Sequence, residues 1–255
     1  MFPSGCRICR QTLTTVSLLP VCPVCLGKIV PLEGLLCRVC GEKIFSPHAQ
    51  AEDGILCGSC RRAAPRFRQA VSYGAYDGVL RELIHLFKYN RTRTAGPLLG
   101  RMLASALSGA SLRDSLLLVP VPLWKGRRTA RGFNQAEAIA RAFLSFRPSG
   151  SIQLDTSSLI RTRDTASQIG LTRRQRRANV RGAFAVADAE KLRGRSVLLV
   201  DDVMTTGTTV NECARVLLRS GAREVFVATV ARATKEAGSA AAMAVAAPRG
   251  VQGHA

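Results

Sequence analysis

The chain has 255 residues, of which 47% are hydrophobic, so it is long enough for one full hydrophobic core and a small additional module. No apolar run approaches the roughly 18 residues that a membrane-spanning helix requires, which excludes an integral membrane protein. The formal net charge of +20 predicts that the protein meets polyanions such as nucleic acid or an anionic membrane surface. Residues 1–10 have neither the basic segment nor the apolar run of a secretory signal. We therefore expect a cytoplasmic protein, with peripheral attachment at the inner face of the membrane as the alternative.

Eight of the nine cysteines lie in the first 60 residues and form four C-x-x-C pairs. The pairs are Cys6/Cys9, Cys22/Cys25, Cys37/Cys40 and Cys57/Cys60. In a reducing compartment this spacing indicates zinc, because two sulfurs of one pair reach the same metal, and full cysteine sets indicate structural rather than catalytic zinc. Joining neighbouring pairs gives two tetrahedral sites, as in a double zinc ribbon. Two alternatives stay open: a nested arrangement that joins the second pair to the third, and redox-active thiols instead of zinc.

After a basic link at 61–68 the composition changes to alternating strand-like and helix-like segments. Residues 70–76 alternate like a strand, and residues 77–88 place their apolar side chains on one helical face. A second helix is predicted at 94–107, and a strand rich in Leu and Val at 115–121. This order predicts an α/β fold with a mostly parallel sheet flanked by helices, preceded by a small cysteine-rich module.

The stretch at 197–209 places four apolar residues before two acids and a hydroxyl-rich turn. A buried strand, a loop and a helix are predicted, and a loop at the end of a parallel strand faces the crevice where α/β sheets bind ligands. The N-terminus of the helix favours an anion. The residues expected around a phosphate are Thr205, Thr206, Gly207, Thr208 and Thr209. Asp201 and Asp202 would repel that phosphate and are better placed to accept hydrogen bonds from two vicinal sugar hydroxyls, so a 5-phosphoribosyl ligand is predicted.

The segment VDDVMTTGTT resembles the phosphoribosyl pyrophosphate signature of type I phosphoribosyltransferases. This resemblance implies that a loop after the strand at 115–121 receives the pyrophosphate, and that a mobile loop between 160 and 184 closes over it. Lys and Arg must balance the charge that Mg²⁺ leaves on the pyrophosphate. The candidates are Lys125, Arg127, Arg128, Arg131, Arg177 and Arg181. For Lys125, Arg127 and Arg128 the alternative is a solvated basic turn. Asn134 and Gln135 are either helix caps or ligand contacts.

Six motifs in a fixed order resemble the ComF family of bacterial competence-associated proteins. They are the C-x-x-C array, LIHLFKY at 83–89, PVP at 120–122, RGFNQ at 131–135, RANVRGAF at 177–184 and VDDVMTTGTT at 200–209. The resemblance implies a double zinc ribbon at 1–64 and a phosphoribosyltransferase-like domain at 65–232. Residues 233–255 are rich in Ala and Gly and are predicted to form a flexible tail.

Two functions fit these features. The first is an accessory factor for natural competence that binds phosphoribosyl pyrophosphate and assists uptake of single-stranded DNA, with a competence helicase or an inner-membrane DNA channel as partner. The second is an active phosphoribosyltransferase of nucleotide or cofactor metabolism with an unknown acceptor. Thr205 weakens the second reading, because several purine transferases carry an acid there that acts as a base. Arg outnumbers Lys by 31 to 6, which suits contacts to a DNA backbone. Two structural zinc ions and Mg²⁺ with the pyrophosphate are the expected cofactors.

Overall fold

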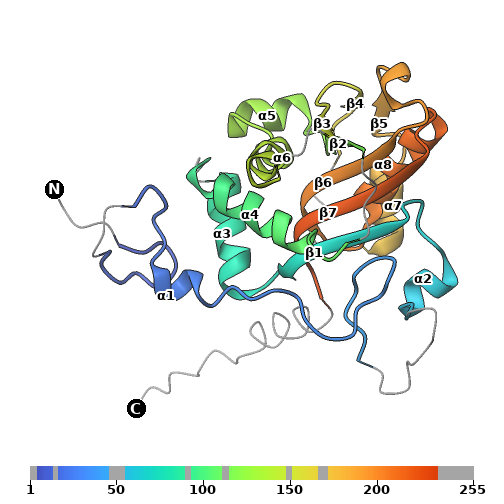
Figure 1. Ribbon diagram of the computed structural model, residues 1–255. Coiled ribbons are helices and arrows are strands. Elements are labelled where there is room, and N and C mark those ends of the chain that lie inside the picture. The colour runs from blue at the N-terminus through green and yellow to red at the C-terminus, as the bar shows by residue number, and fades with distance from the viewer. Residues whose placement is uncertain are drawn as a thin grey trace, which may run out of the picture.

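The computed structural model describes residues 5–13, 17–45, 55–89, 93–110, 115–147, 151–165 and 172–234. A five-stranded parallel sheet in the order β1-β7-β6-β2-β3 forms its centre (Figure 1). The strands are β1 (Gln69–Ala75), β2 (Leu116–Pro120), β3 (Ile152–Leu154), β6 (Ser196–Met204) and β7 (Glu224–Arg232). A separate antiparallel pair consists of β4 (Leu159–Arg161) and β5 (Phe184–Val186). The predicted α/β fold with a mostly parallel sheet is confirmed.

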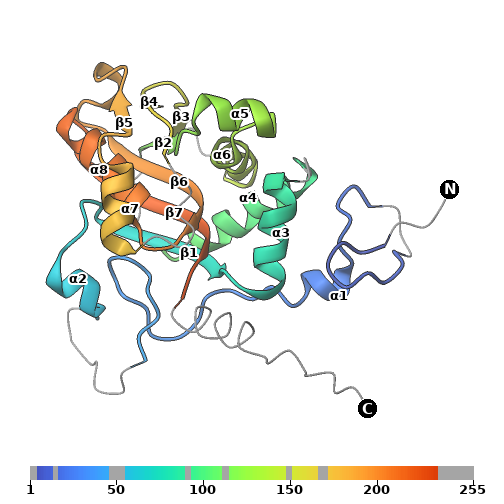
Figure 2. The ribbon, with the colours of Figure 1, turned by 180° about the vertical axis from the view of Figure 1, so that it is seen from behind.

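The central strands are apolar along their whole length because helices cover both faces of the sheet. On the first face lie α3 (Gly78–Tyr89), α4 (Gly96–Ala106) and α6 (Gln135–Phe146), whose buried side chains pack against Leu198 and Val200 of β6. On the second face lie α7 (Arg173–Val180) and α8 (Thr208–Arg219), whose buried side chains form one hydrophobic core with Val197 and Leu199 of β6 (Figure 2). We call these the α3 face and the α8 face. The predicted helices at 77–88 and 94–107 correspond to α3 and α4.

Helices α4 and α6 pack unusually close together on the α3 face. Gly100 makes this approach possible, because a Cβ atom at this position would lie only 2.6 Å from Cβ of Ala142. The remaining short helices are η1 (Arg93–Ala95), α5 (Lys125–Arg131) and η2 (Glu190–Leu192). None of the helices in the described ranges is long and apolar enough to cross a membrane.

The N-terminal segment, which includes α1 (Pro23–Leu26) and α2 (Gly58–Arg62), runs along the open edge of β1. The amide of Ala70 donates to the carbonyl of Val39 at 2.7 Å, and the amide of Leu32 donates to the carbonyl of Tyr73 at 2.6 Å. These bonds occupy backbone groups that an exposed edge strand would leave unpaired. The cysteine-rich segment is therefore joined to the sheet by backbone hydrogen bonds. Apart from Ala233 and Thr234, the predicted tail lies outside the described residues.

Candidate functional site

The eight N-terminal cysteines form two clusters of four. The first cluster contains Cys6, Cys9, Cys22 and Cys25, and the second contains Cys37, Cys40, Cys57 and Cys60. Within each cluster all sulfur atoms lie within 4.8 Å of one another. Neighbouring pairs are therefore joined, as in a double zinc ribbon, and the nested arrangement is wrong.

The sulfur geometry fits a tetrahedral metal ion. A tetrahedron with Zn–S bonds of about 2.3 Å has S···S edges of roughly 3.8 Å. The Sγ atoms of Cys6 and Cys25 lie 3.9 Å apart, and those of Cys40 and Cys57 lie 3.6 Å apart. Burial and the neighbouring thiols raise the pKa of Cys25 to about 12, so four thiolates require a bound cation in this space. Both clusters can hold a metal ion, and each set of four sulfurs leaves no position for a catalytic water.

The end of β6 and the start of α8 form the predicted strand, loop and helix. Gly207 precedes α8 with φ 72°, a left-handed conformation that favours glycine. The hydroxyls of Thr206 and Thr208 lie 3.1 Å apart in this turn. A hollow of about 20 Å³ lies against the turn, and its lining includes Thr209 and Asp201. The turn thus presents amides and hydroxyls to a small space at a helix N-terminus, which is the environment that a phosphate requires.

The two acids at the end of β6 lie in different surroundings. Side chains along a strand alternate between the faces of the sheet, and Leu198 and Val200 belong to the α3 face. Asp202 continues this series, and Nζ of Lys88 at the end of α3 lies 2.5 Å from its Oδ2. Asp201 lies on the α8 face and lines the hollow. The structure therefore gives Asp202 a cationic partner, whereas Asp201 lines the hollow and has no ion pair among the described residues.

These surroundings shift the two carboxyl groups in opposite directions. Burial and the charge of Asp202 raise the pKa of Asp201 well above its usual value. Burial acts in the same direction on Asp202, but the ammonium group of Lys88 outweighs it and lowers the pKa of Asp202. Asp202 and Lys88 thus form a charged pair, and Asp201 is the acid that more readily holds a proton.

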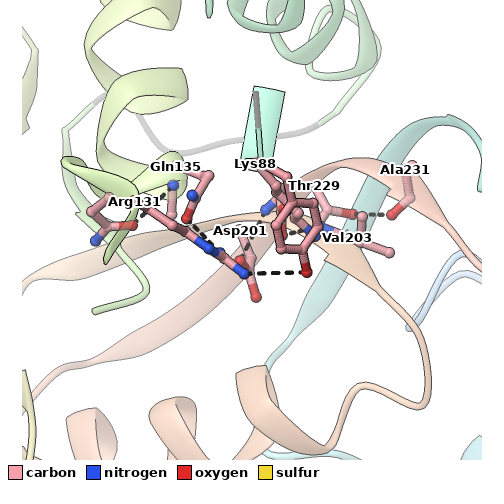
Figure 3. Close-up of polar contacts among 11 residues, drawn as sticks. Lys88, Arg131, Gln135, Asp201, Val203, Thr229 and Ala231 are labelled. Carbon is pink, nitrogen blue, oxygen red and sulfur yellow. Dashed lines mark hydrogen bonds and ion pairs between the residues drawn. The ribbon is translucent and has the colours of Figure 1, made fainter. Parts of the chain in front are cut away.

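Lys88 and Tyr89 were not among the predicted site residues. Figure 3 shows Lys88, Arg131 and Gln135 around the end of β6. Arg131 of α5 donates to Oε1 of Gln135 at 3.0 Å and to the hydroxyl of Tyr89 at 3.4 Å (Figure 3). The available signal for Lys88 was its position, because it directly follows the buried Phe87 at the end of an amphipathic helix.

The structure separates the two readings of Asn134 and Gln135. The side chain of Asn134 accepts a hydrogen bond from the amide of Ala136 at 3.1 Å and donates to the carbonyl of Val121 at 3.0 Å, so it caps α6. Nε2 of Gln135 is buried and has no hydrogen-bond partner among the described residues. Gln135 therefore keeps a free donor next to the end of β6, while Asn134 is occupied by the fold.

The segment after β2 was predicted to be a loop, and this is wrong. Residues Lys125–Arg131 form helix α5, none of whose residues is buried. Arg127 donates to the carbonyl of Thr165 at 2.6 Å, and Arg128 lies 3.9 Å from Glu137. Arg131 therefore makes the described contacts to Gln135 and Tyr89 beside the acids, whereas Arg127 and Arg128 have partners of their own.

The arginine-dense segment between 160 and 184 includes parts of β4 and β5 and the whole of α7, and the mobile loop predicted in this region falls in part on residues 166–171, outside the described residues. From α7, Nη1 of Arg176 donates to the hydroxyl of Thr205 at 3.4 Å. Arg177 lines a larger cavity that also includes Thr205, Thr206 and Thr208. We call the turn at Thr205–Thr209 the phosphate turn, after the ligand predicted for it. The carbonyl of Arg181 accepts a hydrogen bond from Arg163 at 2.8 Å, and Arg181 itself is exposed. Of the predicted pyrophosphate residues, Arg131 thus lies near the end of β6 (Figure 3), and Arg177 lines the cavity together with Thr205 and Thr206.

The chain is similar to known proteins over most of its length, not only around this site. A family model described as "Phosphoribosyl transferase domain" matches residues 130–245. The chain is 33% identical over 231 residues to the DNA utilization protein YhgH of Escherichia coli K12, covering 88% of this chain and 95% of that protein. It is 32% identical over 228 residues to Competence protein F of Haemophilus influenzae, covering 83% and 96%. Competence protein ComFC of Bacillus subtilis is 28% identical over 205 residues, covering 79% of each chain. The similarity therefore includes much more than the matched domain.

Proposed function

This chain belongs to the ComF family of competence-associated proteins, and from that premise we propose that it binds phosphoribosyl pyrophosphate and assists uptake of single-stranded DNA. The phosphate turn is the observation on which this proposal mainly rests. Gly207 and the first amides of α8 provide a place for the 5-phosphate, and the hydroxyls of Thr206 and Thr208 add donors. Asp201, which lines the same hollow, would accept a hydrogen bond from a ribose hydroxyl.

The pyrophosphate would extend from the ribose towards α5. Arg131 and the free donor of Gln135 lie beside the acids, and Lys125 and Arg128 are exposed on the same short helix. A bound Mg²⁺ would neutralise part of the pyrophosphate charge. Asp202, which pairs with Lys88 through Oδ2 and accepts the amide of Val203 at Oδ1, would keep the end of β6 in place.

Calorimetry with phosphoribosyl pyrophosphate and Mg²⁺ tests the assignment. We expect Asp201→Asn to weaken binding by about ten-fold or more, because the NH₂ group of the amide cannot accept a hydrogen bond from a ribose hydroxyl. Asp188→Asn is the matched control, since Asp188 pairs with Lys191 at the surface and should bind like the wild type. Unchanged affinity in Asp201→Asn would refute the site.

The exposed arginines of α7 support the DNA part of the proposal. Arg174 and Arg177 are exposed on this helix, and the whole chain is strongly basic. Anisotropy with a labelled oligo(dT) at 50 and 200 mM salt should show binding that weakens steeply with salt. Arg174→Gln combined with Arg177→Gln should reduce the salt dependence.

In cells, a deletion strain should lose transformation, and the wild-type gene but not Asp201→Asn should restore it. A deletion strain with normal transformation frequency contradicts the competence role.

An active phosphoribosyltransferase is the second candidate, and a cavity of about 430 Å³ next to the phosphate turn favours it. In such a reaction the acceptor nucleophile forms a bond to the anomeric carbon while the bond to pyrophosphate breaks. Pyrophosphate would leave with the electron pair, the acceptor would lose its proton to water, and Arg131 with a bound Mg²⁺ would stabilise the charge on pyrophosphate. A pyrophosphate-release assay over nucleobases and amines tests this candidate. Release that depends on both an added acceptor and Asp201 would favour the enzyme over the accessory factor.

A further inference from the structure

The cavity of about 430 Å³ lies between the phosphate turn and the second cysteine cluster. Thr205, Thr206 and Thr208 form one wall, and Cys40 and Cys60 belong to the opposite wall. Neither acid of β6 lines it, and none of the four cations of α5 does. Its volume is within the range of about 300–1,000 Å³ that small-molecule sites occupy. The cavity is therefore separate from the proposed ribose and pyrophosphate positions, yet it shares the phosphate turn with them.

The charges around this cavity favour an anion. Four arginines line it: Arg62, Arg176, Arg177 and Arg232. Glu42 is the only acid among the described lining residues, and Nη2 of Arg232 lies 2.6 Å from its Oε2. Glu42 and the metal-bound thiolates of Cys40, Cys57 and Cys60 balance part of this positive charge, and the guanidinium groups remain the donors that an anion would use.

Arg232 is the group that marks a binding position. It is the last residue of β7, its exposed fraction is 4%, and Nη2 also lies 3.5 Å from Sγ of Cys40. Its Nε and Nη1 atoms are buried and have no hydrogen-bond partner among the described residues. Buried guanidinium donors without acceptors are costly, and an anionic ligand would supply the missing acceptors.

The other lining residues indicate what accompanies the anionic group. Phe67, Met204, Ala63 and Pro65 form an apolar part of the wall, and Thr234 provides a hydroxyl. Such a mixture of an apolar surface and a few polar groups is typical of sites for small organic molecules. A compact body of one or two rings fits these residues.

We infer that this cavity is a second ligand site, in which Arg232 receives the carboxylate or phosphate of a small cyclic molecule. Cys40 and Glu42 hold the guanidinium from behind, so the second cysteine cluster forms part of the site. The inference rests on the proposed function for the identity of the neighbouring ligand, phosphoribosyl pyrophosphate.

Ligand-observed NMR with the full metal-loaded chain tests the site without phosphoribosyl pyrophosphate. The probes are benzoate and 2-naphthoate, each compared with its neutral carboxamide, and phenyl phosphate compared with phenol. We expect at least one anion to bind about ten-fold more tightly than its neutral partner, and Arg232→Gln to remove this preference. Ala63→Trp, at an exposed position of the wall, should block the same probe by filling the cavity.

A further variant separates loss of binding from loss of folding. Glu42→Gln with Arg232→Gln replaces both partners of the buried pair and should keep both metal ions while losing the probe. Phosphoribosyl pyrophosphate affinity should stay within about three-fold in Arg232→Gln, so failure of the second site is distinguishable from failure of the first. The inference is overturned if no probe binds, if amides bind as well as carboxylates, or if binding survives in both Arg232 variants.

Discussion

The α3 face and the α8 face of the sheet each contain an acid of β6 and adjoin a cysteine cluster, but the contacts of these residues differ. On the α3 face, the first cluster packs with Leu80 and other apolar residues of α3, and Asp202 is paired with Lys88. On the α8 face, the second cluster lines a cavity, and Asp201 lines the hollow of the phosphate turn. We call the α3 face the closed face because its acid of β6 is paired with Lys88, and the α8 face the ligand face because its acid lines a hollow and its cysteine cluster lines a cavity.

The two cysteine clusters differ accordingly. Cys9 of the first cluster is exposed, whereas all four cysteines of the second are buried and share a hydrophobic core with the sheet. Arg232 links the second cluster to the end of β7, but the first cluster has no such contact among the described residues. Paired C-x-x-C motifs therefore join the N-terminal segment to the core of the α3 face, and on the α8 face they line a cavity.

Loss of a ligand from the second cluster should have the largest effect. We expect Cys40→Ser to release one metal ion and to lower the thermal midpoint by about 10 °C or more, because metal binding here is coupled to the folding of the sheet core. Cys9→Ser is the matched change in the first cluster and should lower the midpoint by less than half as much. Calorimetry together with zinc analysis measures both, and equal effects would contradict the distinction between the clusters.

The next largest effect should come from the acid of the closed face. Asp202→Ala leaves the ammonium of Lys88, whose side chain is 17% exposed, without its partner, and should cost about 3–5 kcal/mol of unfolding free energy. Asp201→Ala should cost much less, because Asp201 has no comparable cation. Urea denaturation measures both values. The double change Lys88→Met with Asp202→Leu should recover most of the loss, and a loss of similar size in both single variants would show that the acids are equivalent.

The sequence predicted the sheet because its central strands are continuous apolar runs, and it predicted the strand, turn and helix at 197–219 because they are contiguous. It did not predict α5, since no residue of that helix is buried and no apolar periodicity marks it. The pairing of Lys88 with Asp202 joins residues far apart in the chain, so the sequence places Lys88 at the end of an amphipathic helix but does not indicate its partner. The cavity lined by Arg232 was missed for the same reason, because its walls come from the cysteine-rich segment, α7, the phosphate turn and the end of β7.

The pH dependence of stability should distinguish the two acids further. Burial and Asp202 raise the pKa of Asp201, so the wild type loses stability as pH rises from the unfolded value of about 4 towards the folded pKa of Asp201. Asp201→Asn lacks this ionisation and should become increasingly more stable than the wild type as pH rises from about 4 towards the folded pKa of Asp201. Asp202 has a lowered pKa, so its contribution is retained in this range and is lost only as pH falls below the unfolded value. A constant difference between Asp201→Asn and the wild type over this range would contradict the raised pKa.

The smallest effect should come from the contact that joins the first cysteine cluster to the closed face. The hydroxyl of Thr94 donates to the carbonyl of Leu18 at 2.8 Å in an exposed position, so Thr94→Val should cost only about 0.5–1 kcal/mol. Apolar contacts of Val21 with the core of the α3 face remain in this variant. Zinc release to a chelator should become slightly faster from the first cluster and stay unchanged in the second. If release from the second cluster also accelerated, the two clusters would be coupled through the sheet, and the division of the molecule into a closed face and a ligand face would fail.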